Sequence, residues 1–199
     1  MKQFFKDAKG HLMTGIGYML PLIIGASLVV AIPKLIALCF GITSLDPYAD
    51  GTGVWHIMKL IENVGWTGIG MVNTVLAGFI AYSIADKPAI GAGFIGGAVA
   101  SSTYAGFLGA VIAAFIAGYT VKWAKKHIHL PESMGSVMPL VVCPLIATGF
   151  VAIIMGVILA TPLAAINTWL VNWISSMCQN QSSQLVMAMI LGAMIASDM

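Results

Sequence analysis

Residues 10–33 read GHLMTGIGYMLPLIIGASLVVAIP and contain no aspartate, glutamate, lysine or arginine. One helix needs about 20 consecutive apolar residues to cross a bilayer core, so this stretch is long enough to do so. Three further stretches without charge cover residues 63–85, 88–121 and 133–197. The sequence therefore predicts an all-α integral membrane protein with several transmembrane helices.

The composition of the 199 residues supports this class and excludes others. Hydrophobic residues make up 59% of the chain and charged residues 8%, whereas a soluble domain carries about 25% charged residues. The formal net charge of +2 is too small for a nucleic-acid-binding surface, so no nucleic-acid partner is expected. No cysteine pair or histidine cluster has the spacing of a metal site, and His127 and His129 are expected in a solvated loop. We predict no metal, no cofactor and no catalytic residue.

Hydropathy, prolines and charges divide the single domain, residues 1–199, into helices. We expect about five transmembrane helices, two amphipathic interfacial helices and the start of a sixth span. Pro21 and Pro33 lie inside or near the end of the first span, where proline kinks a helix. The five spans are expected at residues 12–38, 66–85, 88–104, 105–123 and 137–160, and the interfacial helices at residues 54–64 and 162–178.

The path of residues 88–121 is open to two interpretations. Lysines concentrate in cytoplasmic loops, so the lysine-bearing N-terminus is expected inside the cell, and two crossings then place Asp86 inside as well. The lysine cluster at 122–126 should also be inside, which requires an even number of crossings in between. Two short spans meeting near residues 104–106 satisfy this condition. The alternative, one span followed by a re-entrant segment, would put that cluster outside.

The predicted spans contain almost no ionisable side chain, and Asp86 lies only at a span end. Carriers driven by an ion usually keep such groups at membrane depth, so a site for a driving ion is not expected. Hydroxyls, amides and flexible backbone suit a neutral sugar or polyol instead. The residues expected to face a substrate cavity are Asn73, Thr74, Asp86, Lys87, Gly91, Gly93, Gly96 and Gly97.

The glycines have a second interpretation, because GxxxG pairs such as Gly93 and Gly97 also allow close helix packing in lipid. Residues 91–96 match GxGxxG formally as well. No strand precedes this motif and it lies in an uncharged membrane stretch, so a dinucleotide site is not expected.

Four segments, in order along the chain, resemble the membrane (IIC) component of the fructose family of bacterial sugar phosphotransferase systems. They are HLMTGIGYMLP at 11–21, LAGFIAYSIADKP at 76–88, GFLGAVIAAFIAGY at 106–119 and LGAMIASDM at 191–199. The resemblance covers nearly the whole chain. It implies sugar uptake by group translocation, in which the sugar binds in the membrane domain and a phosphocysteine of a IIB partner phosphorylates it on the cytosolic side.

The same resemblance implies IIA and IIB partners, a homodimer, and a place in the bacterial inner membrane with the N-terminus in the cytoplasm. In that family the Asp-Met at 198–199 is followed by Gly-Gly-Pro, further spans and a Glu-containing motif associated with the sugar site. The chain therefore resembles the amino-terminal portion, which leaves the identity of the sugar open. The alternatives are a secondary carrier or facilitator for a small neutral solute, and a truncated assembly partner that transports nothing.

Overall fold

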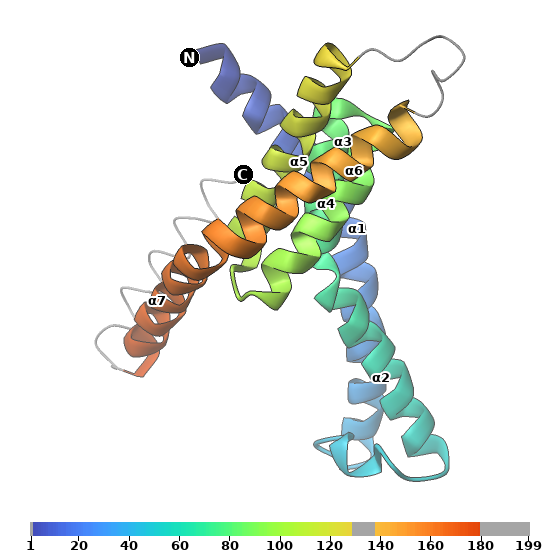
Figure 1. Ribbon diagram of the computed structural model, residues 1–199. Coiled ribbons are helices and arrows are strands. Elements are labelled where there is room, and N and C mark those ends of the chain that lie inside the picture. The colour runs from blue at the N-terminus through green and yellow to red at the C-terminus, as the bar shows by residue number, and fades with distance from the viewer. Residues whose placement is uncertain (1, 129–137, 180–199) are drawn as a thin grey trace.

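The computed structural model describes residues 2–128 and 138–179, and these residues form helices and no strand. Their order along the chain is shown in Figure 1. The helices are α1 (Lys2–Cys39), α2 (Val54–Gly70), α3 (Val72–Ala85), α4 (Lys87–Ser102), α5 (Gly106–His127), α6 (Cys143–Val151) and α7 (Ala160–Gln179), with a 3-10 helix at Asp46–Tyr48 and π-helical segments at Met138–Val142 and Ala152–Leu159.

Within the described residues, four helical stretches are long and apolar enough to cross a membrane: Lys6–Cys39, Val54–Ala85, Gly106–His127 and Met138–Leu159. The predicted fold class, an all-α membrane protein, is confirmed. Helix α4 is not among the four, because its 16 residues extend only about 24 Å, less than a hydrocarbon core of about 30 Å. Which helices cross the bilayer, and how many times, stays a prediction.

Helix α2 differs from the expected interfacial helix at 54–64, because it continues without a break to Gly70. Only Met71 separates it from α3. Packing against α1 explains the continuation. A Cβ atom on Gly65 would lie 2.8 Å from the carbonyl oxygen of Ala26 in α1. Two backbones in such close contact hold this part of α2 in a regular helical path.

Residues 88–121 form two antiparallel helices, α4 and α5, joined by a short turn. Whether α4 crosses the bilayer or enters it only part of the way stays a prediction. The turn that joins them contains Tyr104 and Gly106, both with positive φ, at 57° and 61°. Glycine adopts this conformation without strain. Two contacts show the antiparallel packing: a Cβ on Gly109 would touch Ala100 beside the turn, and one on Gly96 would touch Ala113 farther from it.

The last described segment is continuous helix from Met138 to Gln179, formed by α6, α7 and the two π-helical segments. The expected break between a span ending at 160 and a separate helix at 162–178 is absent. Pro162 lies in the first turn of α7, directly after the π-helical segment Ala152–Leu159, so the proline does not interrupt the helix. The residues beyond 179, including the start of the sixth span, lie outside the described residues.

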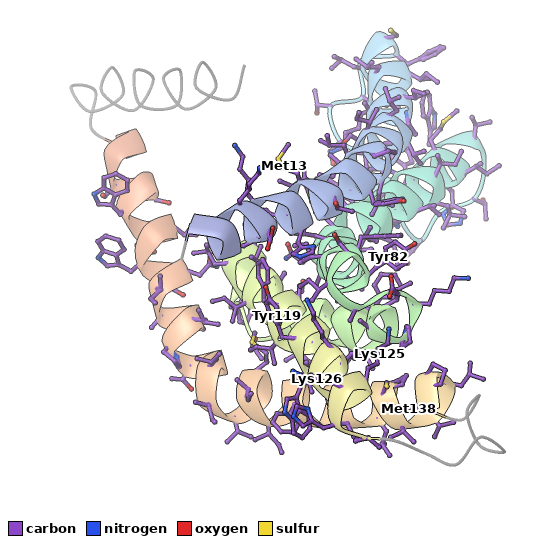
Figure 2. The ribbon with its side chains drawn as sticks, turned by 90° about the horizontal axis from the view of Figure 1, so that it is seen from above. Met13, Tyr82, Tyr119, Lys125, Lys126 and Met138 are labelled. Atoms are coloured by element: carbon purple, nitrogen blue, oxygen red, sulfur yellow. The ribbon has the colours of Figure 1, made fainter. Side chains whose placement is uncertain are left out.

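Helices α3, α4 and α5 form the interior, which is built largely from alanine and glycine. Small residues let helix backbones approach closely, which is the main basis of helix association in lipid. Helix α1 lies along α3, and α6 crosses α4 and α5 (Figure 1). The α1–α2 pair and α7 extend from this bundle in different directions (Figures 1 and 2). Fully buried alanines include Ala77, Ala81, Ala92, Ala110, Ala113 and Ala117.

The antiparallel packing sorts the charged side chains to two ends of the molecule. The first, which we name the lysine-rich end, is where α1 begins and where α3 and α5 end; His11 contacts Ser83 there, and Lys125 contacts Asp86. The second, which we name the paired-charge end, holds the ion pairs of Glu62. The charged residues at the lysine-rich end are Lys2, Lys6, Lys9, Lys87, Lys122, Lys125 and Lys126, with Asp7 and Asp86. Those at the paired-charge end are Lys34 and Lys59, with Asp46, Asp50 and Glu62.

Candidate functional site

A pocket of about 660 Å³ opens at the lysine-rich end, where the corner between α3 and α4 meets the end of α5 and the start of the Met138–Gln179 helix. In Figure 2, Tyr82, Lys125 and Met138 lie on the same side of the molecule. The pocket combines a phenol, a carboxylate and two ammonium groups with an apolar wall. Its lining residues are Tyr82, Asp86, Lys87, Pro88, Gly91, Lys125, Pro139, Leu140 and Pro144.

The sharp turn at Asp86 positions the polar side of this pocket. Asp86 has φ 62° and ψ −161°, a backbone conformation that costs a side-chain-bearing residue about 1–3 kcal/mol. Its backbone N–H donates a 2.8 Å hydrogen bond to the backbone carbonyl of Tyr82, and its own carbonyl accepts a 3.0 Å hydrogen bond from the backbone N–H of Ala89. Pro88 lies in the first turn of α4, where a missing N–H costs nothing. The chain therefore reverses direction within one residue and exposes the Asp86 carboxylate.

Lys125 stabilises this turn from α5. Its Nζ atom donates a 2.7 Å hydrogen bond to the Ala85 carbonyl and lies 3.5 Å from Oδ2 of Asp86. A lysine at the end of a helix compensates the negative end of the helix dipole and satisfies a free carbonyl. The Asp86 side chain is 83% exposed, so its carboxylate keeps acceptor capacity for a ligand.

Of the eight residues predicted from the sequence, the structure brings three together in this pocket: Asp86, Lys87 and Gly91. A Cβ on Gly91 would meet no atom within 4 Å. The backbone of α4 therefore borders open space at this position. A role of these residues in ligand binding stays a prediction.

The other five lie along the contact of α4 with its neighbours. Asn73 is 13 residues before Asp86, about 20 Å along α3, and its Nδ2 donates to Ser101 at 3.1 Å. A Cβ on Gly97 would lie 2.5 Å from the Asn73 carbonyl oxygen and 2.7 Å from the Thr74 Cα. These positions fit the packing interpretation of the glycine-rich segment.

Gly93 and Gly96 complete this packing surface. A Cβ on Gly93 would lie 2.7 Å from the Ala77 carbonyl oxygen of α3. One on Gly96 would lie 2.9 Å from the Cβ of Ala113 in α5. The glycines thus allow α4 to pack closely against both α3 and α5.

A second polar cluster, at the paired-charge end, was not predicted from the sequence. Glu62 is 3% exposed and accepts from Trp66 at 3.0 Å. Its carboxylate also lies 3.1 Å from the ammonium of Lys34 and 3.2 Å from that of Lys59. Lys59 pairs in turn with Asp46 of the preceding loop. Every charged group of this cluster has a partner, so the cluster fits a structural tie between α1, α2 and the loop.

Sequence signals existed for part of this arrangement. The concentration of lysine in cytoplasmic loops predicted Asp86 and the 122–126 cluster on the same side, and Lys125 does contact Asp86. The spacing of Lys59, Glu62 and Trp66 by three and four residues would place them on one helix face. No sequence pattern points to Lys34 as the third partner of Glu62, because α1 and α2 meet only through tertiary packing.

The fold and the pocket together define a helical membrane protein with a polar pocket at its most basic end. The family model "Phosphotransferase system, EIIC" matches residues 13–197. The chain belongs to this family, which confirms the resemblance seen in the sequence.

Curated relatives agree with this membership. The PTS system fructose-specific EIIABC component of Bacillus subtilis (strain 168) is 37% identical over 190 residues, which are 95% of this chain and 29% of that protein. The fructose-like permease IIC component 2 of Escherichia coli (strain K12) is 33% identical over 198 residues, 99% of this chain and 52% of that protein. The chain thus spans about a third to a half of these relatives. No solved structure matches the chain.

Proposed function

We propose that this chain forms the amino-terminal part of a sugar permease that works by group translocation. The observation that carries the proposal is the match of the EIIC family model to residues 13–197. Fructose is named in several relatives, and one relative of 34% identity is named for 2-O-alpha-mannosyl-D-glycerate. These names support a fructose-like sugar or a related glycoside as substrate. None of them supports a secondary carrier or a non-transporting partner.

The pocket at the lysine-rich end is the proposed sugar subsite of this part of the protein. Its volume of about 660 Å³ lies within the range of small-molecule sites, about 300–1,000 Å³. Asp86 would accept hydrogen bonds from sugar hydroxyls, and Lys87 would donate to their oxygens. Gly91 would leave room for the ring. The remaining predicted residues, Asn73 among them, would support the helix packing behind the pocket.

The lysine-rich end is proposed to face the cytoplasm of a bacterial cell. Its described residues include seven lysines and two aspartates, whereas the paired-charge end has two lysines and three acids. Lysine-rich segments stay on the cytoplasmic side of the inner membrane. The N-terminus would then be cytoplasmic. A phosphorylated partner would reach the pocket directly from this side.

IIA and IIB components are the proposed partners, together with the lipid bilayer and a second copy of the chain. Relatives named EIIABC and EIIB'BC support the first part, because their names join A, B and C components or B and C components in one protein. The phosphate donor would supply the driving force for uptake. An ion gradient would need ionisable side chains at membrane depth, and the predicted spans contain almost none.

Membrane vesicles containing the protein together with IIA and IIB components test the proposal. With phosphoenolpyruvate and radiolabelled fructose, we expect sugar phosphate as the product and no effect of a protonophore. Accumulation of unmodified sugar driven by a proton gradient alone would contradict the proposal. Among variants, Asp86→Asn should raise the half-saturating sugar concentration more than Asn73→Ala. Lys126→Gln is the control, since this lysine lies at the same end and does not line the pocket.

A further inference from the structure

A separate pocket of about 410 Å³ lies between the beginning of α1 and the end of α3, at the lysine-rich end. The wall from α1 carries an ammonium group, an imidazole and a hydroxyl on successive turns, and α3 adds a second hydroxyl. No function proposed so far uses this pocket. Its lining residues are Lys6, Asp7, Gly10, His11, Thr14 and Ser83.

Hydrogen bonds between the two helices fix the polar groups of this pocket. His11 Nδ1 lies 2.7 Å from Ser83 Oγ, and Ser83 Oγ donates to Thr14 Oγ1 at 3.5 Å. Thr14 Oγ1 donates in turn to the Gly10 carbonyl at 3.0 Å. Since Nδ1 of the imidazole is engaged with Ser83, Nε2 is the ring atom that can contact a ligand. His11, Thr14 and Ser83 are half-buried, so the groups are held in place and still reachable.

The charge around the pocket favours an anion. Lys6 is part of the lining, and Lys9 follows one turn later on α1. Asp7 is the one acidic residue among the lining residues. Lys6 and Asp7 balance each other within the lining, and the positive charge around the pocket comes from Lys9 and from the excess of lysine at this end of the molecule. The Lys6 ammonium is the donor in this pocket that suits phosphate oxygens. The hydroxyl hydrogens of Ser83 and Thr14 are donated within the protein, and this hydrogen-bonded chain fixes the position of the His11 ring in the same pocket.

The surface next to the pocket suits an acyl chain. Along α1 from the pocket toward the other end, Met13, Leu20 and Ile24 share one helix face and are 57%, 47% and 58% exposed. A Cβ on Gly17, between Met13 and Leu20, would meet no atom within 4 Å. Figure 2 shows Met13 pointing away from the bundle. An apolar strip therefore continues from the polar pocket along the outside of α1.

We propose that this pocket binds the phosphate of an anionic phospholipid whose acyl chains lie along the exposed strip of α1. Basic pockets between membrane helices on the cytoplasmic side are suited to such headgroups. A soluble phosphate ester offers the same phosphate oxygens without acyl chains, and the exposed apolar strip favours the lipid. The site does not depend on sugar transport. It would fasten the beginning of α1 to the end of α3, next to the Asp86 turn.

The proposal is tested with the purified full chain in nanodiscs of phosphatidylcholine, with and without phosphatidylglycerol. We expect phosphatidylglycerol to raise the melting temperature of the wild type. Retention of phosphatidylglycerol in native mass spectrometry should fall by at least about tenfold in the Lys6→Gln/His11→Gln double variant, which loses the Lys6 ammonium and the fixed His11 ring of the pocket. The control is Lys126→Gln, which removes one charge at the same end outside the pocket and should behave as the wild type.

Two further controls are needed. One distinguishes a lipid phosphate from a soluble phosphate, and the other detects a folding defect in the double variant. Inorganic phosphate or glycerol phosphate, added to phosphatidylcholine discs, should not reproduce the rise in melting temperature. If either of them reproduces the full rise, the ligand is a soluble phosphate and the lipid proposal is wrong. If the double variant melts at a lower temperature than the wild type in phosphatidylcholine alone, the single variant Lys6→Gln is used in its place. Lys6 is exposed, so its substitution should leave the fold intact. Wild-type retention of phosphatidylglycerol in a folded variant overturns the proposal.

Discussion

The two ends of the molecule use charge in opposite ways. At the paired-charge end, Glu62 and Lys59 are buried, and each of them has a partner of opposite charge within 3.2 Å. At the lysine-rich end, the ion pair between Lys125 and Asp86 is 3.5 Å long and exposed. The first arrangement stabilises a helix pair. The second leaves charges available to a ligand, a partner or lipid headgroups. Charge is buried and paired at one end, and largely exposed at the other.

The largest effect is expected for Glu62→Gln at the paired-charge end. Removing one charge of a buried network leaves Lys59 without its buried partner, and the expected loss of stability is about 3 kcal/mol. Thermal unfolding in a fixed detergent measures it. The double variant Lys59→Met/Glu62→Leu should recover most of the loss, because buried ion pairs are replaceable by apolar groups. Equal stability of Glu62→Gln and the wild type would remove the structural role of this cluster.

The next largest effect is expected for Gly97→Ala in the packed centre between the two ends. The added Cβ would lie 2.5 Å from the Asn73 carbonyl oxygen, and such overpacking costs about 1–3 kcal/mol. The matched control is Gly91→Ala on the same helix, where the added Cβ would meet open space. Gly91→Ala should be neutral or stabilise the helix by up to about 1 kcal/mol. The same loss in both variants would contradict the packing interpretation.

A smaller effect is expected for Lys125→Met at the lysine-rich end. The variant loses the hydrogen bond to the Ala85 carbonyl, and because this lysine is 36% exposed the loss of stability should be about 1 kcal/mol. Lys126→Met, an exposed neighbour on the same helix, should change the melting temperature less. If the two variants lose the same stability, Lys125 does not hold the turn at Asp86.

The smallest effect concerns pH and the loop at the paired-charge end. Hydrogen bonds from Lys59 and Ser44 lower the pKa of Asp46 below its ordinary value. A lowered folded-state pKa contributes stability above the unfolded-state value, about 3.9, and this contribution disappears as the pH falls through the folded-state pKa. Melting curves between pH 6 and pH 3 should therefore show a slightly larger decline for the wild type than for Asp46→Asn. Parallel curves would contradict the pairing.

The helical class could be predicted from the sequence because it depends on composition alone. Residues 10–33 lack charge over a length that fits one span, and this stretch lies within α1. Helix ends were harder to predict. The expected break before Trp66 is absent because Gly65 packs on α1. Such packing depends on residues far apart in the chain, which hydropathy cannot reveal.

The sequence predicted the part of the candidate site that comes from one short segment, and it missed the parts that come from other helices. Asp86, Lys87 and Gly91 lie within six residues of one another and line one pocket. Asn73 and Gly97 were expected beside them, but helix geometry places them nearer the other end of α3 and α4. Tyr82 lies one helical turn before Asp86 and could have been included on that ground. The contributions of Lys125 and Pro139 depend on α5 and the following helix, and local sequence contains no signal for them.

The sequence alone determined that this chain is helical, lies in a membrane and belongs to the EIIC family. Charge-free stretches and family motifs can both be recognised in the linear order of residues, without knowing how the helices pack. Only the tertiary structure decided which charges are paired and which remain exposed. Lys34 and Lys125 look alike in the sequence, yet one completes a buried network and the other stabilises a turn beside a pocket. The difference arises because helix packing determines which groups meet and how much water remains around them.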